Sequence, residues 1–200
     1  MGLIAEGLRS VLLPCSLAVL VPGLLVVLAS GRAAVGAVAG YSAGLLVMAW
    51  IRFGGHFGLE YRTPALVVAA VILLAGVGLV RAKAAGDPSR GTVPAGAAAV
   101  GGVAAWLWRP CVGLRLGSVL SGIRTDLWGN LVPLALFVVG LMVPLVVLAA
   151  LPVAWPKLGA VRDSVVTGRA GVAGTVVLAG ALAIGVYDDV VVFLFRVSTF

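Results

Sequence analysis

The chain is poor in the residue types on which most catalytic and metal sites depend. Of its 200 residues only 10% are charged, seven are acidic, one is a histidine and two are cysteines. The sequence contains no Cys/His zinc cluster, no glycine-rich phosphate-binding loop and no Ser/His/Asp set. The single histidine, His56, lies in a polar connection, and we expect it to have no chemical role. These shortages disfavour the common hydrolase and metalloenzyme classes.

Apolar residues, by contrast, are abundant. They make up 62% of the chain, and the mean hydropathy is +1.20, whereas soluble domains have about 45–50% apolar and about 25% charged residues. This composition predicts a membrane protein with several spans and no room for a soluble domain. The net charge of +7 comes from basic residues that lie mainly between apolar runs. We therefore expect them to contact a lipid bilayer rather than nucleic acid.

Six apolar segments are long enough to be spans, and their length and continuity predict an all-α fold, because a membrane-embedded backbone must satisfy its own hydrogen bonds. Basic residues are slightly more numerous on the side of the Arg81–Gly91 loop, seven against five. This bias predicts a multi-pass protein of the cell membrane with that loop in the cytoplasm and both termini outside. The predicted spans are Leu8–Leu28, Ala33–Ile51, Pro64–Val80, Pro94–Ile123, Leu127–Leu151 and Ala170–Phe195.

Both cysteines directly follow a proline inside a predicted span. Pro14-Cys15 lies in the first span and Pro110-Cys111 in the fourth, 96 residues further on. Three spans lie on each side of the central loop, so the second half is expected to be inverted relative to the first. The sequence thus predicts one transmembrane domain, residues 1–200, made of two inverted three-helix repeats, about 1–86 and 87–200. Many membrane carriers are built from inverted repeats, and in them paired helices interrupted by glycine or proline indicate the working site.

The prolines are expected to place each cysteine near the start of a new helix segment. Pro14 and Pro110 each remove a helix hydrogen bond and crowd the preceding turn, so the first and fourth helices should break there. The cysteine that follows then lies near a new helix start, where free N–H groups favour a thiolate, the reactive form of the side chain. This argument makes Cys15 and Cys111 the candidate catalytic residues.

Further residues are predicted to support these sites. Arg109 and Arg115 flank Cys111 and add positive charge, while Gly113 permits close approach of another backbone. In the first span, Pro22-Gly23 is expected to disturb the helix a second time.

At these residues the chain resembles the CcdA family of cytochrome c biogenesis proteins, which is related to the transmembrane domain of DsbD. That family has a Pro-Cys in its first span and a P-C-V-G-P-x-L-G-like motif in its fourth. In the first motif Pro14 and Cys15 agree, but Ala18 replaces a usual proline and Pro22 falls one position late. In the second, Leu114 replaces the usual proline. The residues that match the second motif are Pro110, Cys111, Val112, Gly113, Leu116 and Gly117.

The resemblance implies a thiol–disulfide oxidoreductase that acts as an electron relay with no bound cofactor and no metal. Cytosolic thioredoxin would reduce a Cys15–Cys111 disulfide through a mixed disulfide. The dithiol would then reduce an extracytoplasmic thioredoxin-like acceptor, which keeps apocytochrome c cysteines reduced for haem attachment.

Three other interpretations stay open from sequence. A small-solute or metal-ion transporter would also suit inverted repeats and intramembrane charges, with Asp188 and Asp189 as cation or proton ligands. A membrane subunit that only scaffolds a partner would leave the cysteine pair inert. Arg9 followed by an apolar run also gives some support to a cleaved signal peptide, although cleavage would remove Cys15.

Overall fold

The computed structural model describes residues 2–11, 13, 16–54, 63–85, 92–108, 122, 126, 128–155, 165–186, 189 and 193, and every regular element among them is helical. The predicted all-α class is therefore confirmed for this part of the chain. A 3-10 turn, η2 (Gly31–Ala33), joins two of the helices. The α-helices are α1 (Gly2–Ser10), α2 (Leu17–Ser30), α3 (Ala34–Gly54), α4 (Thr63–Ala85), α5 (Thr92–Leu107), α7 (Leu131–Ala154) and α9 (Val165–Ala183).

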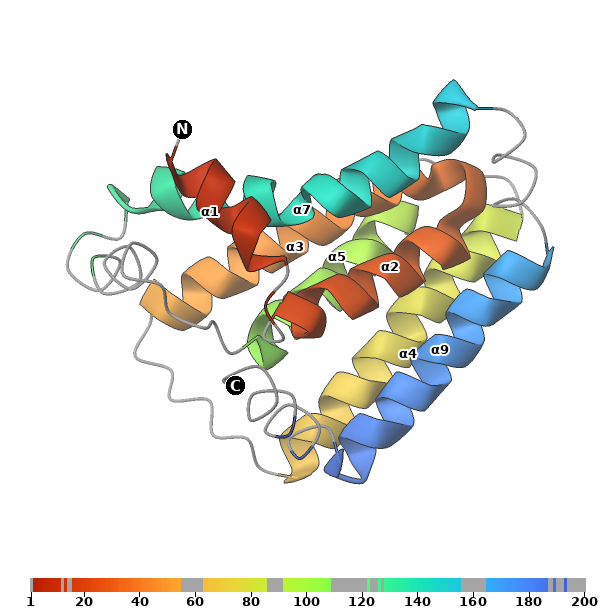
Figure 1. Ribbon diagram of the computed structural model, residues 1–200. Helices are drawn as coiled ribbons and strands as arrows, with labels where there is room; N and C mark the ends of the chain where they lie inside the picture. The colour runs from red at the N-terminus through yellow and green to blue at the C-terminus, as the bar shows by residue number, and fades with distance from the viewer. Residues whose placement is uncertain are drawn as a thin grey trace.

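The long helices form one bundle in which successive helices from α2 onward run in alternating directions (Figure 1). α5 packs along α3 and also contacts α4, while the short helix α1 lies across α7. α4 and α9 pack side by side, and α2 contacts both α5 and α9. The shared core is almost wholly apolar and is centred on large buried side chains such as Tyr41, Leu45, Trp108, Phe137 and Leu141.

Glycines allow the closest helix crossings. A Cβ atom at Gly40 or Gly44 of α3 would collide with the backbone of α5, at Pro94 and Ala98 respectively. These glycines are four residues apart, the small-xxx-small spacing that lets membrane helices approach each other closely. Side-chain size at these positions therefore limits how near α3 and α5 pack.

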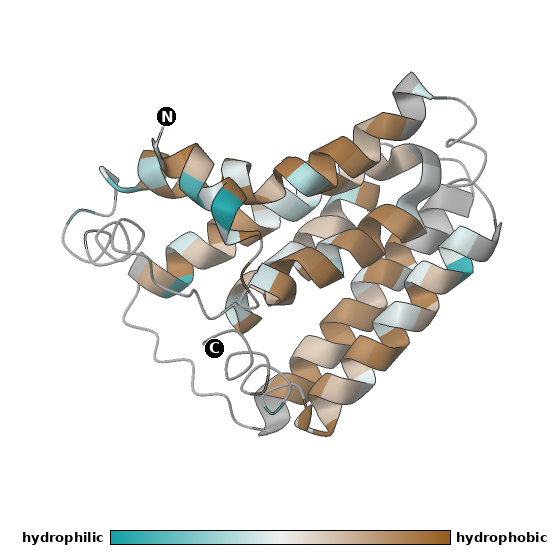
Figure 2. Ribbon diagram, viewed as in Figure 1, coloured by the Kyte–Doolittle hydropathy of each residue, from teal (hydrophilic) through white to brown (hydrophobic). Residues whose placement is uncertain are grey.

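Two helices in the described part of the chain are long and apolar enough to cross a membrane, Ala34–Phe53 in α3 and Leu131–Leu151 in α7. The apolar stretches of α2, α4, α5 and α9 are shorter. Apolar residues cover the outside of the bundle as well as its core, with polar colours mainly on α1 and at helix ends (Figure 2). Val68, Val139 and Val177, for example, are 57%, 55% and 72% exposed. Such a surface is typical of a chain that meets lipid or another apolar partner.

The first predicted span, Leu8–Leu28, is not one helix. α1 ends at Ser10 and α2 begins at Leu17, so the predicted interruption of this segment is present, but the remaining helix is shorter than a full span. The fourth predicted span, Pro94–Ile123, also differs, because α5 ends at Leu107. In both segments the helix stops three or four residues before a proline of the Pro-Cys pairs, as expected if proline cannot join the preceding helix.

Other helix boundaries also differ from the predicted ones. α4 continues to Ala85, so Arg81 and Lys83 belong to a helix and not to the predicted loop. α9 begins at Val165, five residues before the predicted start. It ends at Ala183, and Gly185 adopts a φ of 78°, the left-handed conformation that commonly follows a helix C-terminus. The last predicted span, Ala170–Phe195, is therefore interrupted near Gly185, and the described residues beyond it, Val186, Asp189 and Phe193, are again helical.

The prediction that Pro22-Gly23 disturbs the first span again was wrong. α2 is continuous from Leu17 to Ser30 with Pro22 inside it. Proline is tolerated inside membrane helices that pack against others, and α3 contacts α2 in the turn before Pro22, where the Tyr41 hydroxyl donates to the carbonyl of Val19. Gly23 instead provides room, since a Cβ there would meet Leu145 of α7 and the Tyr41 ring.

Candidate functional site around the two Pro-Cys motifs

Most of the predicted site lies outside the described residues. This holds for both cysteines and for the prolines that precede them, whereas Pro22 and Gly23 lie in α2. The structure does describe the helices that lead to and from the motifs: α1 and α2 around the first, and α5 up to Trp108 before the second. The undescribed site residues are Pro14, Cys15, Arg109, Pro110, Cys111, Gly113 and Arg115.

These flanking elements meet at one end of the bundle. The start of α2 and the end of α5 lie close together in Figure 1, and the two helices are in contact. Phe137 of α7 contacts both chain segments that precede the motifs. Its carbonyl is the atom that a Cβ at Gly7 of α1 would meet, and its ring stacks with Trp108 at a centroid distance of 6.0 Å. Gly7 precedes Cys15 by eight residues and Trp108 precedes Cys111 by three.

Tyr41 of α3 likewise contacts a segment near each motif, in α2 and in α5. Its hydroxyl binds Val19, four residues after Cys15. Its carbonyl is the atom that a Cβ at Gly101 of α5 would meet, ten residues before Cys111. Tyr41 is 1% exposed and Phe137 is 2% exposed. These two buried aromatic residues thus hold together the chain segments that lead to both motifs.

The two links are related by the spacing of the motifs. Phe137 follows Tyr41 by 96 residues, the same interval that separates the Pro-Cys pairs. Gly140 follows Gly44 by 96 residues too, and a Cβ at Gly140 would meet the carbonyl of Ile4 in α1, as one at Gly44 would meet that of Ala98 in α5. The crossing of α1 on α7 therefore repeats the crossing of α5 on α3.

One charged side chain lies at the end of α5. Arg52, near the end of α3, donates from Nη1 to the carbonyl oxygens of Ala105, Trp106 and Trp108 at 2.9, 2.6 and 2.6 Å. Its guanidinium also lies 5.4 Å from the centroid of the Phe53 ring. From the sequence, Arg52 is only a basic residue that follows the predicted span Ala33–Ile51. Its role in capping another helix depends on a tertiary contact that no local pattern records.

Two buried polar atoms in the described part of the chain have no hydrogen-bond partner, Oε2 of Glu6 in α1 and Nε1 of Trp108. Trp108 is 2% exposed and lies between Phe137 and Phe53, whose ring it meets edge to face. Glu6 could have been noticed in the sequence, because an acidic residue beside an apolar run is a usable signal. Both atoms belong to segments that lead into a Pro-Cys motif.

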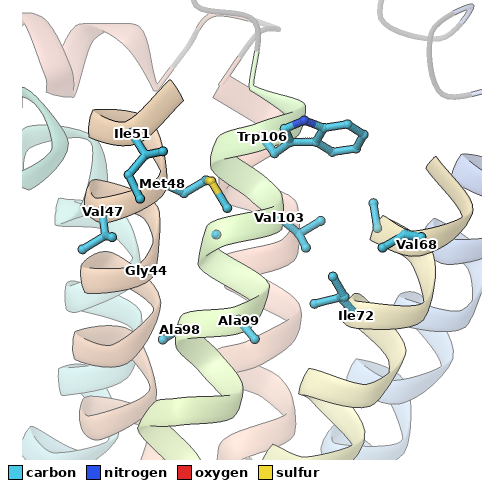
Figure 3. A pocket seen from close by; sticks show the side chains of 12 residues that line it. Gly44, Val47, Met48, Ile51, Val68, Ile72, Ala98, Ala99, Val103 and Trp106 are labelled. Atoms are coloured by element: carbon cyan, nitrogen blue, oxygen red, sulfur yellow. The ribbon is translucent and has the colours of Figure 1, made fainter. Parts of the chain in front are cut away.

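A separate cavity of about 690 Å³ opens between α3, α4 and α5. Its wall includes Met48, Ile51, Ile72, Val103 and Trp106, and Figure 3 shows these side chains converging from the three helices. Among the described residues that line it, none has an acidic, basic or thiol side chain. The described wall of this cavity is therefore an apolar surface.

The carboxylates that favoured a transporter are only partly described. Asp188 lies outside the described residues, and Asp189 is exposed, six residues beyond the end of α9. In the described part of the chain, no group of three or more His, Cys, Asp and Glu side chains is placed to hold a metal ion.

Comparisons of the chain with protein-family models, with curated proteins and with solved structures found no match. The resemblance to the CcdA family therefore rests on the motif residues alone.

Proposed function

We propose that the protein is a transmembrane thiol–disulfide oxidoreductase of the CcdA type. It relays reducing equivalents from cytosolic thioredoxin, through a Cys15/Cys111 pair, to an extracytoplasmic thioredoxin-like acceptor that serves cytochrome c maturation. The observation that carries the proposal is the repeated arrangement around the two motifs. Equivalent glycine crossings of α1 on α7 and α5 on α3 lead to helix ends just before Pro14 and Pro110. Two cysteines in matching positions are what a relay through a single disulfide requires.

The repeated crossings also support the finer topology that we propose, six spans in two inverted three-helix repeats with both termini outside. The alternating directions of the long helices fit successive membrane crossings (Figure 1). Trp128 and Trp155 lie just before and just after α7 and are 71% and 64% exposed. Tryptophan concentrates at the two membrane–water interfaces, so this pair supports α7 as a complete span.

In the proposed cycle each step is a thiol–disulfide exchange. A thioredoxin thiolate attacks one sulfur of the Cys15–Cys111 disulfide, which forms a mixed disulfide and releases the other cysteine as a thiolate. The second thioredoxin thiol resolves the mixed disulfide and leaves oxidised thioredoxin and the Cys15/Cys111 dithiol. The dithiol then reduces the acceptor disulfide by the same two exchanges. Two electrons and two protons thus pass from one dithiol to the next with no cofactor.

Proteoliposomes test this function directly. Vesicles that contain the protein and enclose an oxidised thioredoxin-like acceptor are given reduced thioredoxin on the outside, and acceptor thiols are counted after lysis. We expect acceptor reduction with the wild type and none above empty vesicles with Cys15→Ser or Cys111→Ser. The double change of Asp188 and Asp189 to Asn should leave reduction intact. Reduction that survives loss of a cysteine, or that depends on the two carboxylates alone, would contradict the relay and favour a transporter.

A further inference from the structure

The apolar cavity between α3, α4 and α5 is continuous with the exposed apolar surface of the bundle. Val47 of α3 and Val68 and Ile72 of α4 line the cavity and are also exposed on the outside. Between these two helices α5 contributes the small side chains of Ala98 and Ala99 (Figure 3). A ligand that reaches the apolar surface of the bundle can therefore enter the cavity from the side.

A positive charge lies at one end of this cavity. Arg52 directly follows the wall residue Ile51, and its Nη1 lies 2.6 Å from the carbonyl oxygen of Trp106, another wall residue. Its guanidinium keeps its charge when it donates to neutral carbonyls. Tryptophans gather at the same end, where the ring centroid of Trp50 lies 5.2 Å from that of the exposed Trp128. Tryptophan and arginine are typical of the level of the lipid headgroups.

The length of the cavity fits one lipid tail. Along α5 the wall extends from Ala98 to Trp106, which corresponds to about 12 Å at the rise of an α-helix. One leaflet of a bilayer contains about 15 Å of hydrocarbon, half of the apolar core. In a membrane the cavity would thus extend from the headgroup level towards the bilayer centre, along the path of a single acyl chain.

We propose that this cavity binds one acyl chain of an anionic phospholipid, whose phosphate lies beside Arg52. A lipid tail is as apolar in the bilayer as in the cavity, so the hydrophobic effect contributes little to binding. The tail instead fills the space between the helices and gains dispersion contacts there, while Arg52 selects the lipid by charge. One arginine near the membrane surface corresponds to a preference of about fivefold for an anionic over a zwitterionic headgroup.

Photolabelling from within the bilayer tests this site. The full-length protein is reconstituted into phosphatidylcholine vesicles with a trace of phosphatidylglycerol that carries a diazirine halfway along one chain. Labelled peptides are identified by mass spectrometry after irradiation. We expect more label on the cavity wall than on the exposed face of α9. The same diazirine on phosphatidylcholine should label the wall about fivefold less.

Variants separate the tail site from the charge. Ala99→Phe, or Val68→Trp from α4, places a ring in the cavity and should remove the excess label on the wall. Either variant suffices if the other does not fold. Ala173→Phe adds the same ring at an exposed position of α9 and should leave the excess unchanged. Arg52→Gln should remove the preference for phosphatidylglycerol, and Arg52→Lys, which keeps the charge, should retain it.

Three results would overturn the proposal: equal label on the wall and on α9, an excess that survives both filling variants, or equal labelling by the two lipids. The proposal rests on the proposed membrane location and not on the relay. A variant with both Cys15→Ser and Cys111→Ser should therefore label like the wild type. Loss of electron transfer and loss of lipid labelling are separate results, whereas a protein without label on any helix would contradict the membrane location itself.

Discussion

Tyr41 shows how one buried residue joins two other helices. Its hydroxyl donates to the carbonyl of Val19 in α2, in the turn before Pro22. The same tyrosine contributes the carbonyl that packs against Gly101. A side chain of α3 thus stabilises α2 just after the first motif while its backbone packs on α5 before the second.

Tyr41→Phe should reduce the free energy of unfolding by about 1 kcal/mol, because it removes a buried hydrogen bond between α3 and α2. Thermal unfolding in detergent measures the change. Ser42→Ala is the matched control, since the Ser42 hydroxyl bonds back to Val38 of its own helix, at 2.8 Å, and its removal should cost far less. Equal losses in the two variants would show that the Tyr41–Val19 bond does not stabilise the bundle.

At the scale of whole elements, the length and continuity of the apolar runs predicted helices, and each of the six predicted segments contains one. The boundaries of α3 and α7 agree with the predicted spans Ala33–Ile51 and Leu127–Leu151 within a few residues. These two segments were predictable because each is one uninterrupted apolar run that ends at polar or aromatic residues. The central loop was harder to place, because Arg81 and Lys83 are good helix formers whose charge resembled a loop signal.

Proline gave a less uniform signal. The same residue type lies between the ends of α1 and α2 and also inside a continuous α2. Inside α2, neighbouring helices pack against the turn around Pro22, through the Tyr41 hydroxyl at Val19 and close contacts at Gly23. A single sequence does not contain these tertiary contacts, and for the same reason the cap that Arg52 provides could not be predicted.

The glycine crossings give a prediction about pairs of helices. Gly44→Ala and Gly140→Ala should each lower the free energy of unfolding by about 1–3 kcal/mol, because the added methyl group collides with the backbone of Ala98 or Ile4. Gly78→Ala and Gly180→Ala introduce a methyl group into open space and should be neutral or stabilising by up to about 1 kcal/mol. Thermal unfolding of the four variants is the measurement. Similar behaviour at all four positions would remove the basis for the repeated crossing.

In the molecule as a whole, three sets of positions are separated by 96 residues: the two Pro-Cys pairs, Tyr41 and Phe137, and Gly44 and Gly140. The sequence revealed only the first of these. The others are pairs of common apolar residues or glycines, and only the packing of α1 on α7 and α5 on α3 shows that they are equivalent. The inverted repeat that we propose is thus more visible in helix contacts than in sequence identity.

The central claim is that Cys15 and Cys111 form one reversible disulfide. The most direct measurement is a count of free thiols with a mass-adding alkylating reagent, in denatured protein that was first mildly oxidised. We predict no added mass before reduction, two additions after incubation with reduced thioredoxin, and a trapped mixed disulfide with thioredoxin in Cys15→Ser or Cys111→Ser. Two freely alkylated cysteines after oxidation, or a disulfide that forms only between molecules, would contradict the account.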